Sequence, residues 1–440
     1  MTGKETIRNS GSKVPGAVTE GNSKLLILAF FLLNLFSWVS YVEFKFGIPQ
    51  IVKYVLSLGV LVIMVYYRLR HPKTPEPGSI VKPVLIIFLL WTLALLAWAV
   101  SSFNSIFYIQ RLFGQKFFFI PYLLPLILLF SRFDLTFFRH YLNFAAIMIV
   151  PAIIMQIIVV AMGMNPSNWI EETGRIGIFD IGSWLLLLTA QLLKKKHITI
   201  LVTVYYLIWL LLWSVYGRRG ALVEYLVLLI FMVMMRLKSP LFNFHDRIKI
   251  YFAGIIVLLL LLVAGQVITS SYAFQRGISI EGFEESRGGF KYFFAEFDTL
   301  SEWLFGRGLD GTVIREINNE EGATGVIENG FLTVILKGGL LYLIPFLILL
   351  LRASYLGFYR SNNDLVKGLA TLLLIHVLLM TYFNLPDYST KYSLVWISVA
   401  VCYNPELRKL SNKDVYLALN PVVRKKADSK KTIRKPVSQS

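Results

Sequence analysis

The sequence predicts an all-α polytopic membrane protein of about twelve transmembrane helices, with both termini cytoplasmic and one long periplasmic loop. Three observations lead to this class: 56% of the 440 residues are hydrophobic, only 16% are charged, and the mean hydropathy is +0.63. Soluble domains carry about 25% charged residues, so this chain could not cover its surface with polar groups in water. Lipid is therefore the expected solvent.

Apolar segments recur along the chain at lengths that suit a bilayer, since about 20 helical residues cross about 30 Å of hydrocarbon. The expected spans lie at 25–42, 48–67, 83–101, 117–131, 141–163, 181–193, 198–215, 220–235, 250–269, 329–351, 368–385 and 391–403. The segments at 117–131, 181–193, 220–235 and 391–403 are short, which suits tilted, broken or poorly bounded helices. Residues 1–24 are polar without a signal-peptide core and are expected to be a disordered cytoplasmic tail.

Lys and Arg occupy alternate connections between these spans. The basic connections hold Arg68, Arg70, Lys73, Arg132, Arg139, Lys194, Lys195, Lys196, Arg236, Lys238, Arg247, Lys249, Arg352, Arg360 and Lys367. Because positive residues stay on the cytoplasmic side, this alternation places both termini, including the basic tail at 404–440, in the cytoplasm. The membrane is expected to be a bacterial inner membrane. The net charge of +18 therefore indicates orientation, and no nucleic-acid-binding motif accompanies it.

The same alternation leaves residues 270–328 outside as a long periplasmic loop, between helices 1–9 at 25–269 and helices 10–12 at 329–403. Within the loop, apolar side chains recur at helical spacing and predict an amphipathic helix that lies on the bilayer or caps a cavity. A loop helix packed on the bundle explains the pattern equally well. These residues are Phe290, Phe293, Phe294, Phe297, Leu300 and Leu304.

Arg218 and Arg219 lie in a tight outer turn between the seventh and eighth expected spans. An Arg at a helix centre costs about 2.5–3.5 kcal/mol on insertion scales and less near the ends, and an anionic ligand would offset that cost. A lipid-linked pyrophosphate fits, because guanidinium groups bind phosphate oxygens in bidentate geometry. Both side chains could equally reach ordinary lipid headgroups. Other outer arginines, each of which could be only a surface charge, are Arg175, Arg276, Arg287, Arg307 and Arg315.

If the ligand is a sugar linked to a lipid pyrophosphate, transfer of that sugar to a hydroxyl group also requires a general base, because the attacking hydroxyl must lose a proton. Glu328 is the best-placed outer carboxylate, at the start of the tenth span, although a carboxylate there could simply stabilise the helix terminus. Inside the membrane, Glu224 is a candidate counter-ion for the arginine pair, and His376 a helix–helix hydrogen-bond partner. Competing outer carboxylates are Asp310, Glu320, Glu321 and Asp387.

Several chemistries find no support in the sequence. It contains no phosphate loop, no Gly-x-Gly-x-x-Gly that follows a strand and no His-Glu-x-x-His, so no cofactor is expected. No Cys/His cluster predicts a metal site. The single cysteine, Cys402, excludes an intrachain disulfide.

Three segments of the chain stand out as motifs. They are Gly217-Arg218-Arg219-Gly220-Ala221-Leu222, Leu304-Phe305-Gly306-Arg307-Gly308-Leu309, and Glu328-Asn329-Gly330-Phe331-Leu332 followed by Gly338-Gly339-Leu340-Leu341. Together they resemble the O-antigen polymerase/ligase family of bacterial envelope glycosyltransferases. The first is similar to the family's Ser-Arg-Gly-Ala turn, with Arg218 in place of its serine, the second to its Leu-Phe-Gly-x-Gly-Leu segment in the long periplasmic loop, and the third to the entry to the next helix. Arg175-Ile176-Gly177 also resembles the family's Arg-x-Gly element.

The resemblance implies a polymerase of lipid-linked oligosaccharide repeat units that uses an undecaprenyl-pyrophosphate-linked glycan as donor and as acceptor. In that reading Arg219 and Glu328 are catalytic, and Arg218, Arg175, Asn329, Arg287 and Arg307 bind substrate. A chain-length regulator is a possible further partner, beside membrane lipids. Family ligases have a histidine where this chain has Glu328, which favours polymerisation over ligation. A flippase for lipid-linked sugars and a cell-wall glycan polymerase remain alternatives.

Overall fold

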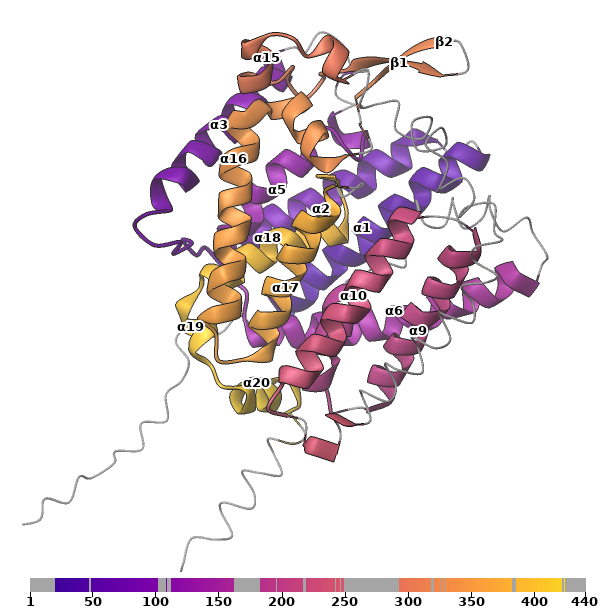
Figure 1. Ribbon diagram of the computed structural model, residues 1–440, viewed down its shortest axis with the longest axis vertical. Helices are drawn as coiled ribbons and strands as arrows, with labels where there is room; N and C mark the ends of the chain where they lie inside the picture. Colours follow the sequence, from indigo (N-terminus) through magenta and orange to yellow (C-terminus); the bar gives the residue numbers. More distant parts are fainter. Residues whose placement is uncertain are drawn as a thin grey trace, which may run out of the picture.

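The computed structural model is a bundle of α-helices with one two-stranded antiparallel hairpin (Figure 1). It describes residues 20–46, 49–101, 108, 112–161, 183–194, 196–216, 219–241, 243–245, 247–248, 293–317, 320–325, 327, 329–381, 385–421 and 423. The helices of the first part of the chain are α1 (Glu20–Phe46), α2 (Gln50–Arg70), α3 (Lys82–Ser101), α5 (Ile120–Leu128), α6 (Leu135–Ala161), α8 (Ser183–Thr189), η2 (Ala190–Leu192), α9 (Lys196–Tyr216) and α10 (Arg219–Lys238). The remaining elements are α15 (Leu300–Phe305), β1 (Val313–Ile317), β2 (Glu320–Thr324), α16 (Gly330–Tyr359), α17 (Asp364–Leu379), α18 (Thr390–Tyr403), α19 (Pro405–Lys409) and α20 (Asn412–Leu419).

The helical class is confirmed for the part of the chain that the structure describes. Every expected span falls on a helix except 250–269, which lies outside the described residues. Of the described helices, α2, α3 and α16 are long and apolar enough to cross a membrane, and shorter apolar helices run over 21–36, 183–192 and 197–210. The total of about twelve spans stays a prediction.

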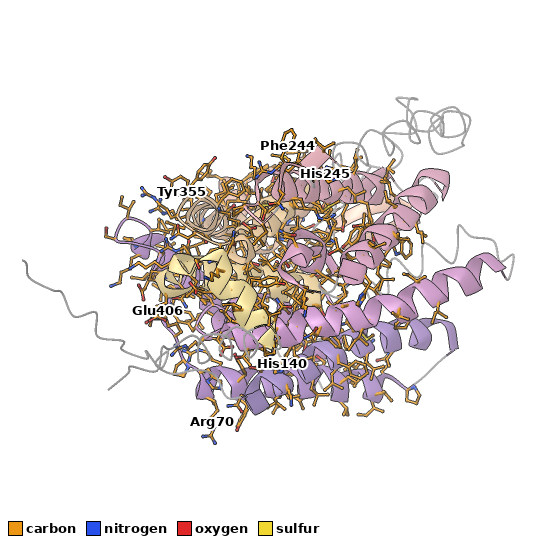
Figure 2. All side chains as sticks on the ribbon, turned by 90° about the horizontal axis from the view of Figure 1, so that it is seen from below. Arg70, His140, Phe244, His245, Tyr355 and Glu406 are labelled. Atoms are coloured by element: carbon orange, nitrogen blue, oxygen red, sulfur yellow. The ribbon has the colours of Figure 1, made fainter. Side chains whose placement is uncertain are left out.

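The connections that carry the predicted cytoplasmic charges meet at one end of the bundle. The backbone N–H groups of Lys73 and Arg132 each donate at 2.8 Å, to the carbonyl oxygens of Phe130 and His71. Ser239, after α10, hydrogen-bonds Asp364 at the start of α17. Here we call this the basic end; it holds residues 71–73, 130–132, 239 and 364 together with α19 and α20. It lies at the bottom of Figure 1 and faces the viewer in Figure 2, where Arg70, His140 and Glu406 are labelled.

The opposite end, which we call the loop end, holds α15, the β1–β2 hairpin, residues 327–330 and residues 380–391 (Figure 1). Its pieces are joined by backbone hydrogen bonds. The N–H of Gly330 donates to the Met380 carbonyl at 2.7 Å, and the N–H of Tyr388 donates to the Lys116 carbonyl at 2.7 Å. Because α10 ends at the basic end, its first residue, Arg219, lies at the loop end.

Two of the short expected spans are broken helices inside the bundle. Helix α5 has nine residues and contains Pro125, and α8 has seven residues, every one of them buried. Backbone that leaves a helix at membrane depth is tolerated only where protein surrounds it, because lipid offers no hydrogen-bond partner. Their burial therefore explains why these segments can be shorter than a bilayer.

The middle of the bundle is aromatic. The ring centroid of Phe88 on α3 lies 5.1 Å from that of Tyr342 and 5.4 Å from that of Trp396, which joins α3 to α16 and α18. Peripheral helices instead turn large apolar side chains outward. On α2 these include Ile51, Val55, Val62 and Leu69. Such faces suit contact with lipid tails.

The prediction of one amphipathic helix in the outer loop is wrong. Residues 293–296 are helical, residues 297–299 are not, and α15 begins only at Leu300. Thr299 is the N-cap of α15: its backbone is extended and its side chain accepts a hydrogen bond from the N–H of Glu302. A new helix therefore begins here, and the preceding turn does not continue into it. Phe293 and Phe297 are buried, whereas Leu300 is 74% exposed. Phe290 lies outside the described residues.

Candidate functional site

The outer loop meets α16 at a break in that helix. Gly339 has φ 66° and ψ −173°, a conformation that glycine adopts without strain. A Cβ at Gly339 would collide with the Leu304 carbonyl, and one at Gly306 would lie 2.7 Å from the Gly339 nitrogen. The segment 304–308 therefore packs directly on the break, which brings together two of the three segments that carry the family likeness.

The carbonyl groups released by the break are satisfied by neighbours. The N–H of Arg307 donates to the Leu336 carbonyl at 2.7 Å. The indole N–H of Trp91, on α3, donates to the Gly338 carbonyl at 2.7 Å. A buried carbonyl group without a hydrogen-bond partner costs free energy, so these two contacts stabilise the broken conformation of α16.

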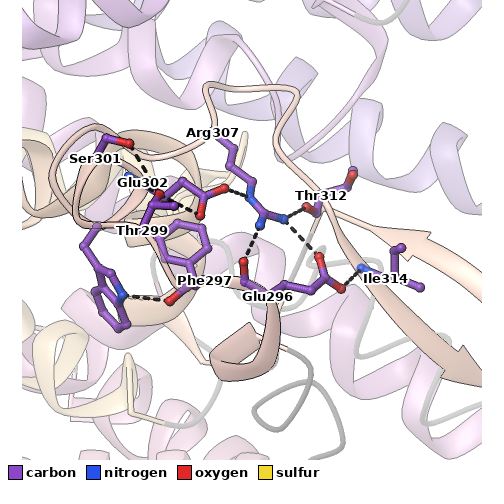
Figure 3. A network of polar contacts seen from close by, with 9 residues as sticks. Glu296, Phe297, Thr299, Ser301, Glu302, Arg307, Thr312 and Ile314 are labelled. Atoms are coloured by element: carbon purple, nitrogen blue, oxygen red, sulfur yellow. Dashed lines mark hydrogen bonds and ion pairs between the residues drawn. The ribbon is translucent and has the colours of Figure 1, made fainter.

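Arg307 organises the loop above this break (Figure 3). Its Nε donates to Glu302 Oε1 at 2.8 Å, and Nη1 donates to Glu296 Oε2 at 3.0 Å and to the Thr312 carbonyl at 2.8 Å. Nη2 donates to the Glu296 carbonyl at 2.8 Å, and the guanidinium lies 5.1 Å from the Phe297 ring centroid. The predicted substrate contact of Arg307 is not tested, but these bonds give it a structural role in holding the loop together.

The same network shifts the protonation of its members. Desolvation alone would raise the pKa of Glu302, but the hydrogen bonds from Arg307 and Thr299 and the Arg307 charge together lower it below its usual 4.5. Partial burial would lower the pKa of Arg307, but hydrogen bonds and charge from Glu296 and Glu302 raise it. Both shifts favour the charged forms, so the charges of Glu302 and Arg307 stabilise each other.

Lys337 lies inside α16, one residue before the glycine pair, and its side chain is buried. Its Nζ donates to the Gly311 carbonyl at 2.7 Å. A Cβ on Gly325 would lie 2.9 Å from the same Nζ, so the loop passes close to the ammonium group. Lys337 therefore ties the stretch around 311–325 to α16.

Asn329 is the N-cap of α16. Its Oδ1 accepts from the N–H of Leu332 at 3.0 Å, and its Nδ2 donates to the Thr381 carbonyl at 3.0 Å. The neighbouring Ile327 is fixed by Thr333, whose hydroxyl donates to the Ile327 carbonyl at 2.9 Å. Glu328 itself lies outside the described residues. Both of its neighbours are held at the loop end, beside the end of α17.

The predicted arginines are described only in part. Arg219 is the first residue of α10, and its side chain is outside the described set. Arg218, Arg175 and Arg287 lie outside the described residues entirely. The structure therefore gives the end of the molecule at which the backbone of Arg219 lies, and it leaves the predicted contacts with substrate untested.

A second polar cluster lies beneath the start of α10. Lys391 Nζ, on α18, is 3.1 Å from Glu224 Oε1, on α10. The same ammonium lies 4.1 Å from the ring centroid of Trp184, on α8. We name this contact of three helices the Lys391 cluster. The counter-ion role predicted for Glu224 toward the arginines stays untested, and Glu224 forms an ion pair with Lys391.

Two competing carboxylates have partners at the loop end. Asp387 Oδ2 lies 3.0 Å from Lys116 Nζ, and Asp387 Oδ1 accepts from the Ser389 hydroxyl at 2.6 Å. Asp310 Oδ2 accepts from the Tyr108 hydroxyl at 2.5 Å. Each of these contacts joins the outer loop or the start of α18 to the segment between α3 and α5. Among the described residues, no group of His, Cys, Asp or Glu could hold a metal ion.

Comparison with protein-family models, with curated proteins and with solved structures finds no match to this chain. The likeness to the polymerase/ligase family therefore rests on the short sequence motifs alone.

Sequence reasoning missed Lys337, Lys391 and the β1–β2 hairpin. The signal for Lys337 was present, because a lysine within a long apolar helix must find a partner. Lys391 resembled an ordinary residue at the edge of a span, and nothing in its local sequence pointed to Glu224, 167 residues earlier. The hairpin register, from Val313 opposite Thr324 to Ile317 opposite Glu320, follows an alternation too short to detect.

Proposed function

We propose that the chain is an inner-membrane glycosyltransferase that polymerises lipid-linked oligosaccharide repeat units at its loop end, on the periplasmic face. The observation that carries the proposal is the convergence of the likeness segments. Segment 304–309 packs on the glycine pair of α16, residues 329–332 begin at the N-cap of α16, and residues 219–222 form the start of α10 at the same end. That segments far apart in the sequence reach one end of the bundle supports the proposal.

Helix α17 links the two sides of this site. It packs against α8, α10, α16 and α18. At its C-terminal end, the carbonyl oxygen of Met380 accepts a hydrogen bond from the N–H of Gly330. The N–H of Met380 in turn donates to the His376 carbonyl oxygen at 3.1 Å. Asn329, the residue after Glu328, therefore lies on the α16 side of α17, and the backbone of Arg219 lies on the α10 side.

The reaction needs only groups that these segments supply. A hydroxyl oxygen of the acceptor glycan attacks the anomeric carbon of the donor, and the bond from that carbon to the pyrophosphate oxygen breaks. Glu328 accepts the proton of the attacking hydroxyl. Arg219, with Arg218 and Arg175, stabilises the charge on the departing lipid pyrophosphate. The pyrophosphate is already an activated leaving group, so the proposal requires no nucleotide sugar.

Purified protein reconstituted with lipid-linked repeat units tests the proposal. Wild-type protein should extend the glycans into a ladder of longer chains. Arg219→Ala should abolish or strongly shorten the ladder, whereas the matched control Arg360→Ala, at the basic end, should leave it unchanged. An unaltered ladder in Glu328→Gln, with Glu406→Gln as its control, would remove Glu328 as the base.

A flippase is the second candidate, and the broken α16 favours it, because discontinuous helices line the substrate paths of many transporters. The same reconstitution separates the two functions. A flippase moves the lipid-linked glycan across the vesicle membrane without changing its length. Adding a lipid A core acceptor tests the ligase alternative, since a ligase transfers glycan to that acceptor.

A further inference from the structure

The mechanism leaves the Lys391 cluster without a role, although it joins three helices at the loop end. Lys391 and Glu224 are only 17% and 18% exposed, and their charged atoms are 3.1 Å apart. Trp184 covers the ammonium from the α8 side, with its ring centroid 4.1 Å away. An ion pair and a cation–π contact on one ammonium group hold α8, α10 and α18 at fixed distances.

The location of Lys391 is unfavourable without these partners. It is the second residue of α18, after the N-cap Ser389, and the first turn of that helix contains no acidic residue. The amino terminus of a helix carries partial positive charge and repels a cation. The attraction of Glu224 and Trp184 for the ammonium group compensates for this repulsion. Lys391 is therefore better explained by its contacts with these two residues than by the stability of α18.

The cluster acts directly on the elements that carry the predicted phosphate ligands. Glu224 follows Arg219 by five residues on α10, a rise of about 7.5 Å at 1.5 Å per residue. Trp184 is the second residue of α8, the helix that follows the segment containing Arg175. One ammonium group therefore fixes the beginnings of two helices that lead from predicted arginines.

We propose that Lys391 is a positioning residue for the arginines that bind the donor pyrophosphate, acting through Glu224 and Trp184 and not through substrate. The inference rests on the proposed function. It also gives a function to a lysine and a glutamate within the predicted membrane region, where ionised groups are costly.

A double-mutant cycle tests the proposal in reconstituted vesicles, at equal amounts of folded protein. Lys391→Met and Glu224→Gln should each raise the KM for the lipid-linked substrate at least 10-fold, and the double variant should be no worse than the poorer single variant. The charge swap Glu224→Lys with Lys391→Glu should return the KM to within about 3-fold of wild type, because the opposite pair restores the contact. Lys73→Met, which removes the contact of Lys73 with Glu406 at the basic end, is the control and should leave the KM unchanged. Independent, multiplying effects without rescue by the swap would overturn the proposal.

A second readout does not depend on activity. Spin labels at Arg219→Cys and Leu378→Cys, in a Cys402→Ser background, should give one narrow distance distribution in the otherwise wild-type protein. Lys391→Met should broaden or shift that distribution, and the charge swap should narrow it again. An unchanged distribution in Lys391→Met would overturn the positioning role. If the wild-type protein makes no polymer but the distances respond as expected, the positioning role stands and the proposed function fails.

Discussion

The two ends of the bundle use their charges differently. At the basic end, Lys73 and Arg132 approach Glu406 only to 3.8 and 3.9 Å, and the Glu406 side chain is 64% exposed. At the loop end, Arg307 lies 2.8 Å from Glu302, Lys116 lies 3.0 Å from Asp387, and Lys391 lies 3.1 Å from Glu224.

This difference separates two uses of positive charge in one membrane protein. Long contacts with one exposed carboxylate suffice for cations whose predicted role is orientation, because the preference for the cytoplasmic side depends on the number of charges near the membrane. Short, partly buried ion pairs instead define geometry, because both partners lose water and must satisfy each other. The ion pairs at the loop end therefore fix the distances between the helices and loop segments that they join.

The largest expected effect comes from breaking the pair between Lys391 and Glu224. Lys391→Met removes a 3.1 Å ion pair with a partly buried carboxylate and should lower the free energy of unfolding by about 3–5 kcal/mol. Thermal unfolding in detergent measures the change. The double variant with Glu224→Gln should recover much of the loss, because the carboxylate that lost this ion pair is then also neutral. A double variant as unstable as the single one would show that the pair is not the cause.

The break in α16 gives the next largest effect. Gly339→Ala forces a residue with a Cβ into φ 66° and against the Leu304 carbonyl, and should destabilise the protein by about 2–4 kcal/mol. Gly59→Ala, in the middle of α2 with no atom within 4 Å of the added Cβ, is the matched control. It should be neutral or stabilise by up to about 1 kcal/mol. Equal effects of the two substitutions would contradict the packing of the loop on the break.

The Arg307 network predicts a dependence on pH. The folded-state pKa of Glu302 is below its usual 4.5, so its contribution to stability is complete above that value and is lost as the pH falls through the lowered pKa. Limited proteolysis of the outer loop should therefore accelerate below about pH 4.5. Glu302→Gln should remove the acid-sensitive component attributable to this residue. Acid sensitivity that is identical in Glu302→Gln would assign it to another group.

The smallest effect should come from the basic end. Lys73→Ala removes a long, exposed contact with Glu406 and should change the free energy of unfolding by less than about 1 kcal/mol. The same unfolding assay, at low and at high salt, measures it. A loss comparable to that of Lys391→Met would erase the distinction between the two ends.

Helix positions could be predicted from the sequence because lipid imposes a simple rule of apolar length. The expected span 83–101 coincides with α3, at Lys82–Ser101, almost residue for residue. The rule fails where protein replaces lipid as the surroundings, as in the buried, nine-residue α5. It also gives no view of contacts between distant residues, which is why Lys391 and its partner Glu224 were found only in the structure.

The site was predictable to a different degree. The segments around Gly306 and Gly338 could be singled out as motifs, but their contact depends on a positive φ at Gly339 that no periodicity reveals. Asn329 was predicted to bind substrate, whereas its side chain caps α16 and holds the end of α17. A residue within a motif can thus be explained by the local fold, and only the structure separates that role from catalysis.

The sidedness of the two ends tests the central claim most directly. In a Cys402→Ser background, Leu300→Cys on α15 and Lys413→Cys on α20 can be treated with a membrane-impermeant thiol reagent in intact cells. The label should react with residue 300 at once, and with residue 413 only after the inner membrane is permeabilised. Labelling of residue 413 in intact cells, with residue 300 protected until permeabilisation, would place the loop end in the cytoplasm and contradict the account.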